Sequence, residues 1–312
     1  MSILIEKVLT RLLILSLTTV VVYGGTARAR DIFVNNQTGD NRRDGSSAVM
    51  VGQAGGPCRS IGRALQLAQN GDRIILAATG EPYRESVTLQ AGRHSGAERR
   101  PFEIIGNGAV LDGSHPVPKG VWRHVGDEIY RFRPSRMAHH NLFLDDKPVA
   151  RKKVKRGELL PKLEPLEWCL FDRHVYFRPE PGRGPHQYEL SHTVLPIGIT
   201  LYEVRHIVIT DLVVQGFQLD GINAHDSVFD ATLAGLTSRG NGRSGIAING
   251  ASRVKIVACL IGDNGTAQIH ADGHSHTEII NCDLIPKSAP SVVRLGGEVL
   301  VRKDDTAAQA RR

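Results

Sequence analysis

A short alternation of apolar and polar positions returns four times between residues 204 and 297. Each copy has apolar or small residues at its first, third, sixth and eighth positions. The copies begin at Ile207, Ala231, Val254 and Thr277, at spacings of 24, 23 and 23 residues. Alternation with period 2 indicates β-strands, because successive side chains of a strand point to opposite faces. A fixed period of this size indicates a solenoid, whose units bury their apolar faces only against their neighbours.

A second short apolar strand follows each copy after a polar or Gly-rich turn, at 221–222, 245–248, 268–271 and 292–295. Strands of successive coils would pair in parallel, about 4.8 Å apart. The predicted fold is therefore all-β, a parallel β-helix. The register predicts one inward column made of Leu212, Leu236, Cys259 and Cys282.

The N-terminal part predicts a cap for this solenoid. Ser60 is a suitable N-cap for an amphipathic helix over 60–70, and Gly71 is a suitable stop. Such a helix would cover the first coil, whose strand edges and apolar surface would otherwise meet water. We therefore expect the cap and the first coils within residues 30–121.

From residue 122 to residue 191 the period disappears, and most of the aromatic residues of the chain gather there. Hairpin signals recur, for example across 144–148 and 170–177. We predict a small antiparallel β insertion over 122–191, followed by β-helix coils over 192–301.

The repeats, together with 31–40, 60–74 and 83–85, resemble the right-handed parallel β-helix superfamily typified by pectate lyase. The resemblance implies a right-handed solenoid and a secreted carbohydrate-active protein. Because this fold carries many activities, two classes stay open. The first is a polysaccharide lyase or glycoside hydrolase, and the second is a non-catalytic glycan-binding or structural surface protein.

Residues 1–29 have the pattern of a secretory signal peptide. A charged start precedes an apolar run over 12–22, and Ala27-Arg28-Ala29 forms a small-x-small cleavage pattern. The run is short for a membrane span, so after cleavage we expect no integral span and a secreted or periplasmic location. An uncleaved anchor is the alternative. The polar tail 302–312 is expected to be disordered.

Charge indicates the kind of partner. The chain carries +7, and removing residues 1–29 (three basic, one acidic) leaves +5. A basic exported protein favours an anionic partner, so we expect an acidic polysaccharide and no nucleic acid.

Candidate chemistry lies where turns of successive coils stack. His225, Asn249 and Asp272 are 24 and 23 residues apart and should form one outward row, flanked by Arg239 and Arg243. Imidazole beside carboxylate and guanidinium could abstract a proton and neutralise a uronate carboxylate. We therefore select His225, Asp272 and Arg239 as catalytic candidates, and as substrate-binding candidates Asp220, Asn223, Arg243 and Asn249. A polar column that only satisfies the bends of the solenoid is the alternative.

Residues 220–249 also bear a local resemblance to secreted mannuronan C5-epimerases. Asn223-Ala224-His225-Asp226 falls on the Asp-Pro-His-Asp/Glu motif of that family. The catalytic Tyr of the family falls on Asp220, and its two catalytic Asp fall on Asn223 and Asn249. Only His225 is retained, so we do not expect epimerase activity by that mechanism.

Two further stretches of the sequence each allow two interpretations. His270, His274 and His276 are metal candidates or a solvated turn, and the sequence leaves calcium dependence open while indicating no other cofactor. The basic run 151–156 could bind an acidic glycan or be a solvated loop.

The four cysteines are Cys58, Cys169, Cys259 and Cys282. Cys259 and Cys282 should stack about 5 Å apart, so they are either a disulfide or two buried thiols. The spacing contains no CxxC metal motif.

Overall fold

The computed structural model describes residues 29–136, 138–155 and 157–303. The predicted signal peptide lies outside them apart from Ala29, as does the predicted tail from residue 304 onward. Within these ranges no helix is long and apolar enough to cross a membrane.

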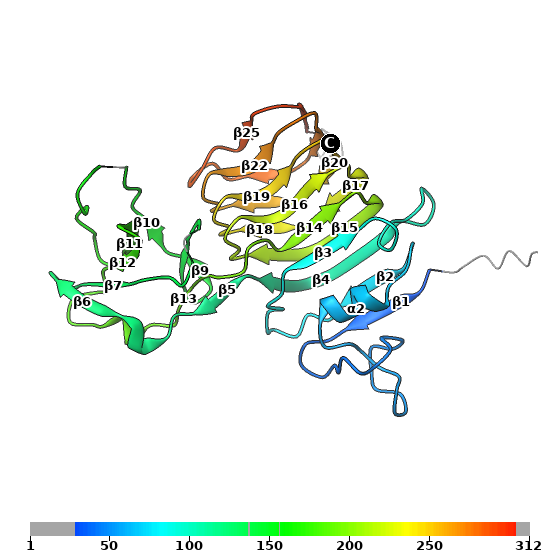
Figure 1. The fold of residues 1–312 in the computed structure, drawn as a ribbon, viewed down its shortest axis with the longest axis horizontal. Helices are drawn as coiled ribbons and strands as arrows, with labels where there is room; N and C mark the ends of the chain where they lie inside the picture. Colours follow the sequence, from blue (N-terminus) through cyan, green and yellow to red (C-terminus); the bar gives the residue numbers. More distant parts are fainter. Residues whose placement is uncertain (1–28, 137, 156, 304–312) are drawn as a thin grey trace, which may run out of the picture.

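Parallel strands of successive coils form two long sheets of the solenoid (Figure 1). The larger sheet runs in the order β1 (Asp31–Val34), β2 (Arg73–Leu76), β4 (Phe102–Asp112), β15 (Arg205–Gln215), β17 (Phe229–Ala234), β20 (Arg253–Val257), β23 (His276–Ile280) and β26 (Glu298–Arg302). Its bent continuation holds β18 (Thr237–Arg239), β21 (Leu260–Gly262) and β24 (Asp283–Leu284). The six-stranded sheet runs in the order β25 (Val292–Arg294), β22 (Ala267–Ala271), β19 (Ser244–Ile248), β16 (Asp220–Asp226), β14 (Ile199–Tyr202) and β3 (Val87–Gln90). The predicted parallel β-helix is confirmed, and its last strand, β26, includes Arg302, the first residue of the predicted tail.

The repeat sets the register of the core. Leu233 pairs with Ile209 on one side and with Ile256 on the other, so equivalent residues of successive coils stack. The predicted inward column is confirmed: Leu236 and Cys259 are at most 2% exposed, and Cys282 packs against the same core. Cys58, Cys169, Cys259 and Cys282 are all free thiols, so the buried Cys259 and the partly buried Cys282 fill this column without a disulfide.

A sharp bend separates the two halves of the larger sheet in every coil. Its residues have positive φ, the left-handed region that favours Gly, Asn and Asp. The equivalent positions are Asn107, Asp211, Gly235, Ala258 and Asn281. Ala258, with φ of 50°, is the unusual member, because a Cβ in this region costs about 1–2 kcal/mol.

The N-terminal cap contains helix α2 (Ile61–Leu67), whose Ile61, Ala64 and Leu65 are buried against the solenoid core. Ser60 Oγ accepts the N–H of Arg63, so the predicted N-cap is observed. The helix is shorter than predicted, because Ala68 is already extended, with ψ of 150°, before Gly71 is reached.

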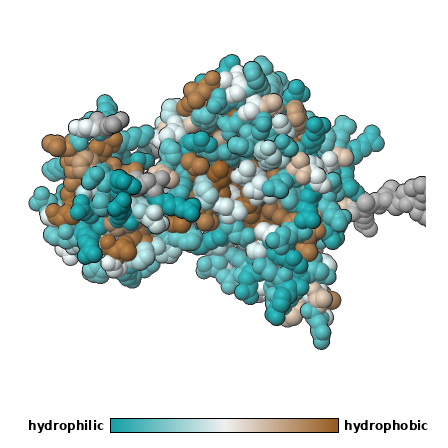
Figure 2. Space-filling view, in the orientation of Figure 1, coloured by the Kyte–Doolittle hydropathy of each residue, from teal (hydrophilic) through white to brown (hydrophobic). Residues whose placement is uncertain are grey.

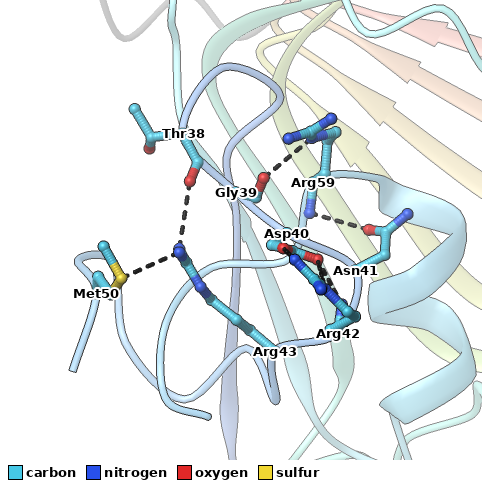
Figure 3. A network of polar contacts seen from close by, with 8 residues as sticks. All are labelled: Thr38, Gly39, Asp40, Asn41, Arg42, Arg43, Met50 and Arg59. Atoms are coloured by element: carbon cyan, nitrogen blue, oxygen red, sulfur yellow. Dashed lines mark hydrogen bonds and ion pairs between the residues drawn. The ribbon is translucent and has the colours of Figure 1, made fainter. Parts of the chain in front are cut away.

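Hydrogen bonds hold the loop that precedes this helix (Figure 3). Asn41 Oδ1 accepts the N–H groups of Arg59 and Ser60, each at 3.0 Å, and Arg42 pairs with Asp40 at 2.6 Å. The ion pair is exposed, so the Asn41 contacts to the backbone are the ones that fix the entry to the helix.

The insertion forms two small sheets beside the solenoid (Figure 1). One contains β10 (Ala150–Arg151), β11 (Glu167–Phe171), β12 (His174–Phe177), β7 (Ile129–Phe132) and β6 (Arg123–Gly126). The other contains β5 (Ser114–Pro116), β13 (Leu190–Thr193), β8 (Leu142–Leu144) and β9 (Lys147–Pro148). Two 3-10 turns, η1 (Lys119–Val121) and η2 (Pro185–Gln187), connect these strands. Strand β5, which precedes residue 122, pairs with β13 of the insertion. Strand β10 pairs with β11 in parallel, whereas the other pairs of these two sheets are antiparallel.

Candidate functional site

The insertion docks on one corner of the solenoid, the turn 240–242 between β18 and β19. Asn141 Nδ2 donates to the carbonyl of Gly240 at 2.8 Å. A Cβ on Gly240 would lie 2.7 Å from the Phe143 ring, and a Cβ on Gly242 would lie 2.7 Å from His139. The absence of side chains at Gly240 and Gly242 therefore permits this close contact between the insertion and the solenoid.

Asp220 is the most enclosed charged side chain at this corner, with 0% exposure. Its carboxylate accepts Arg243 Nε at 2.9 Å, Ser244 Oγ at 2.5 Å and Asn223 Nδ2 at 3.0 Å, and Arg243 Nη2 contacts its second oxygen. The hydrogen bond to Asp220 raises the pKa of Arg243. This carboxylate is fully satisfied, so its geometry is that of a buried structural anchor rather than a free acid or base.

Arg239 lies on the other side of the corner and does not border the predicted row. Its Nε donates to Gln215 Oε1 at 2.9 Å, and Gln215 Nε2 donates to the buried Asp112 at 3.2 Å. Arg84 Nη1 completes this ladder, 3.7 Å from Asp112. The assignment of Arg239 to the row was wrong, because the turn 240–243 carries the chain from one sheet to the other between Arg239 and Asn249.

His225, Asn249 and Asp272 do lie in successive register at the ends of β16, β19 and β22. The N–H of Asn249 donates to Ala224 O, and the N–H of Asp272 donates to Ile248 O, each at 2.9 Å. His225 is exposed, and its ring centroid lies 5.8 Å from that of Tyr202 on the adjacent strand. We call Tyr202, His225, Asn249 and Asp272 the edge row. Figure 2, in the orientation of Figure 1, shows hydrophilic residues interspersed with hydrophobic patches over the solenoid.

The asparagines of the corner have structural partners. Asn249 Nδ2 donates to Asn223 Oδ1 at 3.0 Å, which connects the edge row to the Asp220 cluster. Asn241 is fully buried, and its Nδ2 donates to Asn264 Oδ1 at 3.0 Å. Part of the epimerase resemblance thus comes from residues that satisfy the bends of stacked coils.

The three metal candidates do not converge. Gly273, with φ of 68°, turns the chain between β22 and β23, so His270 lies on the six-stranded sheet and His276 begins a strand of the larger sheet. His276 Nδ1 lies 3.1 Å from Glu298. His274 is exposed on the turn between them. In the part of the chain that the structure describes, no three His, Cys, Asp or Glu side chains gather closely enough to hold a metal ion.

Two residues of this region escaped the sequence analysis. Tyr202 precedes His225 by 23 residues, so the repeat spacing itself could have indicated it. His139 reaches the corner from the insertion, and its position carries no signal in the sequence. Partial burial, and next the positive charge of Arg243, lower the pKa of His139, which keeps its imidazole neutral near pH 7. The arrangement thus offers a neutral imidazole at His139, an exposed imidazole at His225 and one buried carboxylate paired with Arg243.

Comparisons with known proteins bear on the fold. Residues 197–292 match a family model described as "Right handed beta helix region". No curated protein sequence matches the chain. A solved structure described as "Glycoside hydrolase" is 12% identical, with a TM-score of 0.60 over 81% of this chain and 73% of its own.

Two further solved structures are less similar. The complex of XylC with xylose is 12% identical, with a TM-score of 0.46 over 87% of this chain and 70% of its own. Pectate lyase Pel9A is 10% identical, with a TM-score of 0.31 over 89% and 79%. At these identities such likeness concerns the fold alone. With the parallel registers and the family match, the solenoid is a right-handed parallel β-helix.

Proposed function

We propose that this right-handed β-helix protein is exported and binds an extended polysaccharide across the outer face of its six-stranded sheet. The edge row carries the proposal, because it presents an exposed aromatic ring and three polar side chains at the spacing of the coils. Steps of about 4.8 Å suit a chain of repeating sugar units. Tyr202 would supply a flat amphipathic surface, while Asn249 and Asp272 would accept and donate hydrogen bonds to hydroxyl groups.

The enzymatic form of this proposal is a lyase or glycoside hydrolase acting on an acidic polymer. His225 would then be the base, since its imidazole is exposed at the edge row and can reach a bound sugar. Arg243 would stand nearest to the uronate carboxylate, with about a third of its side chain exposed. The fold likeness to a glycoside hydrolase is compatible with this form and adds no residue roles.

One observation favours a non-catalytic form. The buried acids on the two sides of the corner, Asp220 and Asp112, are each held by arginine or amide donors. Among the described residues no carboxylate hydrogen-bonds to His225. A base without an orienting partner suits recognition better than turnover. Recognition is therefore the function that the geometry supports best.

The test is a screen of neutral and acidic polysaccharides by affinity electrophoresis, with product assays for unsaturated ends and reducing ends. Tyr202→Ala should weaken binding about 10-fold, within the range of about 0.5–1.5 kcal/mol for an aromatic contact. His225→Ala should abolish turnover of an enzyme while leaving most of the binding. Arg239→Gln is the matched control, since it lies beyond the corner. Unchanged binding with Tyr202→Ala and His225→Ala would contradict the proposed face.

A further inference from the structure

A pocket of about 550 Å³ opens between the insertion and the last turns of the solenoid. Strand β10 lines it from one side with Arg151, and Lys153 follows. The turns at 263–265 and 287–288 line it from the other side. This volume lies within the range of about 300–1,000 Å³ that is usual for small-molecule sites.

Positive charge dominates the pocket. Arg151, Lys153 and Lys287 contribute three cations, and Asp263 contributes the single carboxylate. Among the described residues no ion pair joins Asp263 to any of the three. Like charges held at one concave surface repel one another, and an anion relieves that repulsion.

Two of the cations are held in place by neighbouring groups. The Arg151 guanidinium lies 5.0 Å from the centroid of the buried Trp168 ring, and its Nη1 donates to His140 O at 3.3 Å. Lys153 Nζ reaches across to Ser288 O at 3.1 Å. The Trp168 ring and the His140 carbonyl hold the guanidinium in place, and within the described part of the chain this carbonyl is its one hydrogen-bond partner. N–H donors therefore remain for a carboxylate or sulfate, which arginine can bind through two parallel bonds.

We propose that this pocket is an anion-binding site for the carboxylate or sulfate group of an acidic saccharide. It lies near the N-terminal ends of β22 and β25, whereas the edge row lies at the C-terminal ends of β16, β19 and β22. The pocket would therefore be a second contact for the same polymer, across the width of the sheet. The identity of the carrier as a polysaccharide rests on the proposed function, whereas the anion site rests on the pocket alone.

Trp168 supplies a direct reporter. The chain has two tryptophans, so Trp122→Phe leaves the fluorescence of Trp168, against which Arg151 stacks. Titration with glucuronate and with inorganic sulfate should give a saturable change, and glucose should give none. Calorimetry with the unmodified protein and the same ligands gives the result if Trp122→Phe does not fold.

Charge removal tests the residues. Lys287→Gln and Arg151→Gln should each weaken glucuronate binding at least 5-fold, and the difference should shrink in high salt. Lys255→Gln is the control, because it removes an equal charge from the larger sheet, where Lys255 pairs with Glu278 at 3.8 Å. Equal affinity for glucose and glucuronate, equal losses in Lys255→Gln and Lys287→Gln, or no loss in either pocket variant would overturn the proposal.

Binding assays with polysaccharides distinguish the proposed anion site from the proposed function of the six-stranded sheet. Polygalacturonate and dextran sulfate should bind more tightly than dextran, and Lys287→Gln should remove that preference. Glucuronate binding without any polysaccharide binding would refute the function proposed for the sheet and leave the anion site standing. Polysaccharide binding that depends on Tyr202 but not on Lys287 would refute the anion site and leave the function proposed for the sheet standing.

Discussion

Arg243 holds the buried carboxylate of Asp220 across two successive coils, with Nε and Nη2 each on a different oxygen. The pair links β16 to the start of β19 at the corner where the insertion docks. Asp220 is fully buried, whereas about a third of the Arg243 side chain is exposed. Because the two side chains differ in exposure, removing one of them should lower the free energy of unfolding more than removing the other.

Arg243→Gln should therefore destabilise the protein more than Asp220→Asn. The first change leaves a buried carboxylate without its cation and should lower the free energy of unfolding by about 3–5 kcal/mol. The second change leaves the partly exposed Arg243 guanidinium without its carboxylate, but water can solvate it. It should lower the free energy of unfolding by about 1–3 kcal/mol. Chemical denaturation would measure both, with Arg294→Gln at an exposed position as the control. A larger loss for Asp220→Asn would contradict the assigned roles.

Replacement of Ala258 by glycine should not destabilise the protein. With φ of 50° it occupies a conformation that costs about 1–2 kcal/mol for a non-glycine residue, whereas glycine costs about 0.5–1 kcal/mol in chain entropy. Ala258→Gly should be neutral or stabilising by up to about 1 kcal/mol. The same substitution at Ala234, the last residue of β17, should be destabilising. Equal effects at the two sites in thermal unfolding would show that the bend is not strained.

Leu236→Asp should unfold the solenoid. Leu236 is 1% exposed within the inward column, and an unpaired carboxylate there costs several kcal/mol. Leu260→Asp, in the next coil, is the matched control, because Leu260 is 45% exposed. Circular dichroism should show loss of β-structure in the first variant only. A folded Leu236→Asp protein would disprove the register.

Leu65→Lys should uncover the first coil. Leu65 is 5% exposed where α2 packs on the solenoid, so a lysine would lift the helix and expose apolar surface and strand edges. Light scattering should then show association. Gln66→Lys, on the exposed side of the same helix, should remain monomeric if the parent is monomeric. Equal behaviour of both variants would place the protective cap elsewhere.

The insertion should lose stability in acid through His192. Burial, and next the positive charges of His140 and His115, lower the pKa of His192 from 6.5 to about 4. Between pH 6.5 and about 4, His192 is protonated in the unfolded chain but stays neutral in the folded chain. The free energy of unfolding is therefore highest above pH 6.5 and falls as the pH drops toward 4. The slope per pH unit would be at most about 1.4 kcal/mol for one group. His192→Phe should flatten the pH dependence of Tm in this window, and an unchanged profile would refute the assignment.

The sequence by itself determined the solenoid. Period-2 alternation with a 23–24-residue repeat leaves one way to bury Leu212, Leu236 and their equivalents, namely against the neighbouring coils, so fold, register and core column could be predicted. The N-cap at Ser60 was likewise local, since a side-chain oxygen and an N–H three residues away are enough to make it. Three members of the edge row, His225, Asn249 and Asp272, followed from the same spacing.

Only the tertiary structure decided which side chains near that row are free. Arg239 and Arg243 are four residues apart, yet the turn between them directs one toward Gln215 and the other toward Asp220. The insertion brings His139 to the corner, and Arg151 and Lys153 to face Lys287, across sequence separations that no repeat encodes. Strand register is a local consequence of alternation, whereas the docking of an aperiodic segment depends on side-chain packing between parts that are distant in the sequence. That packing positions the charges of this face.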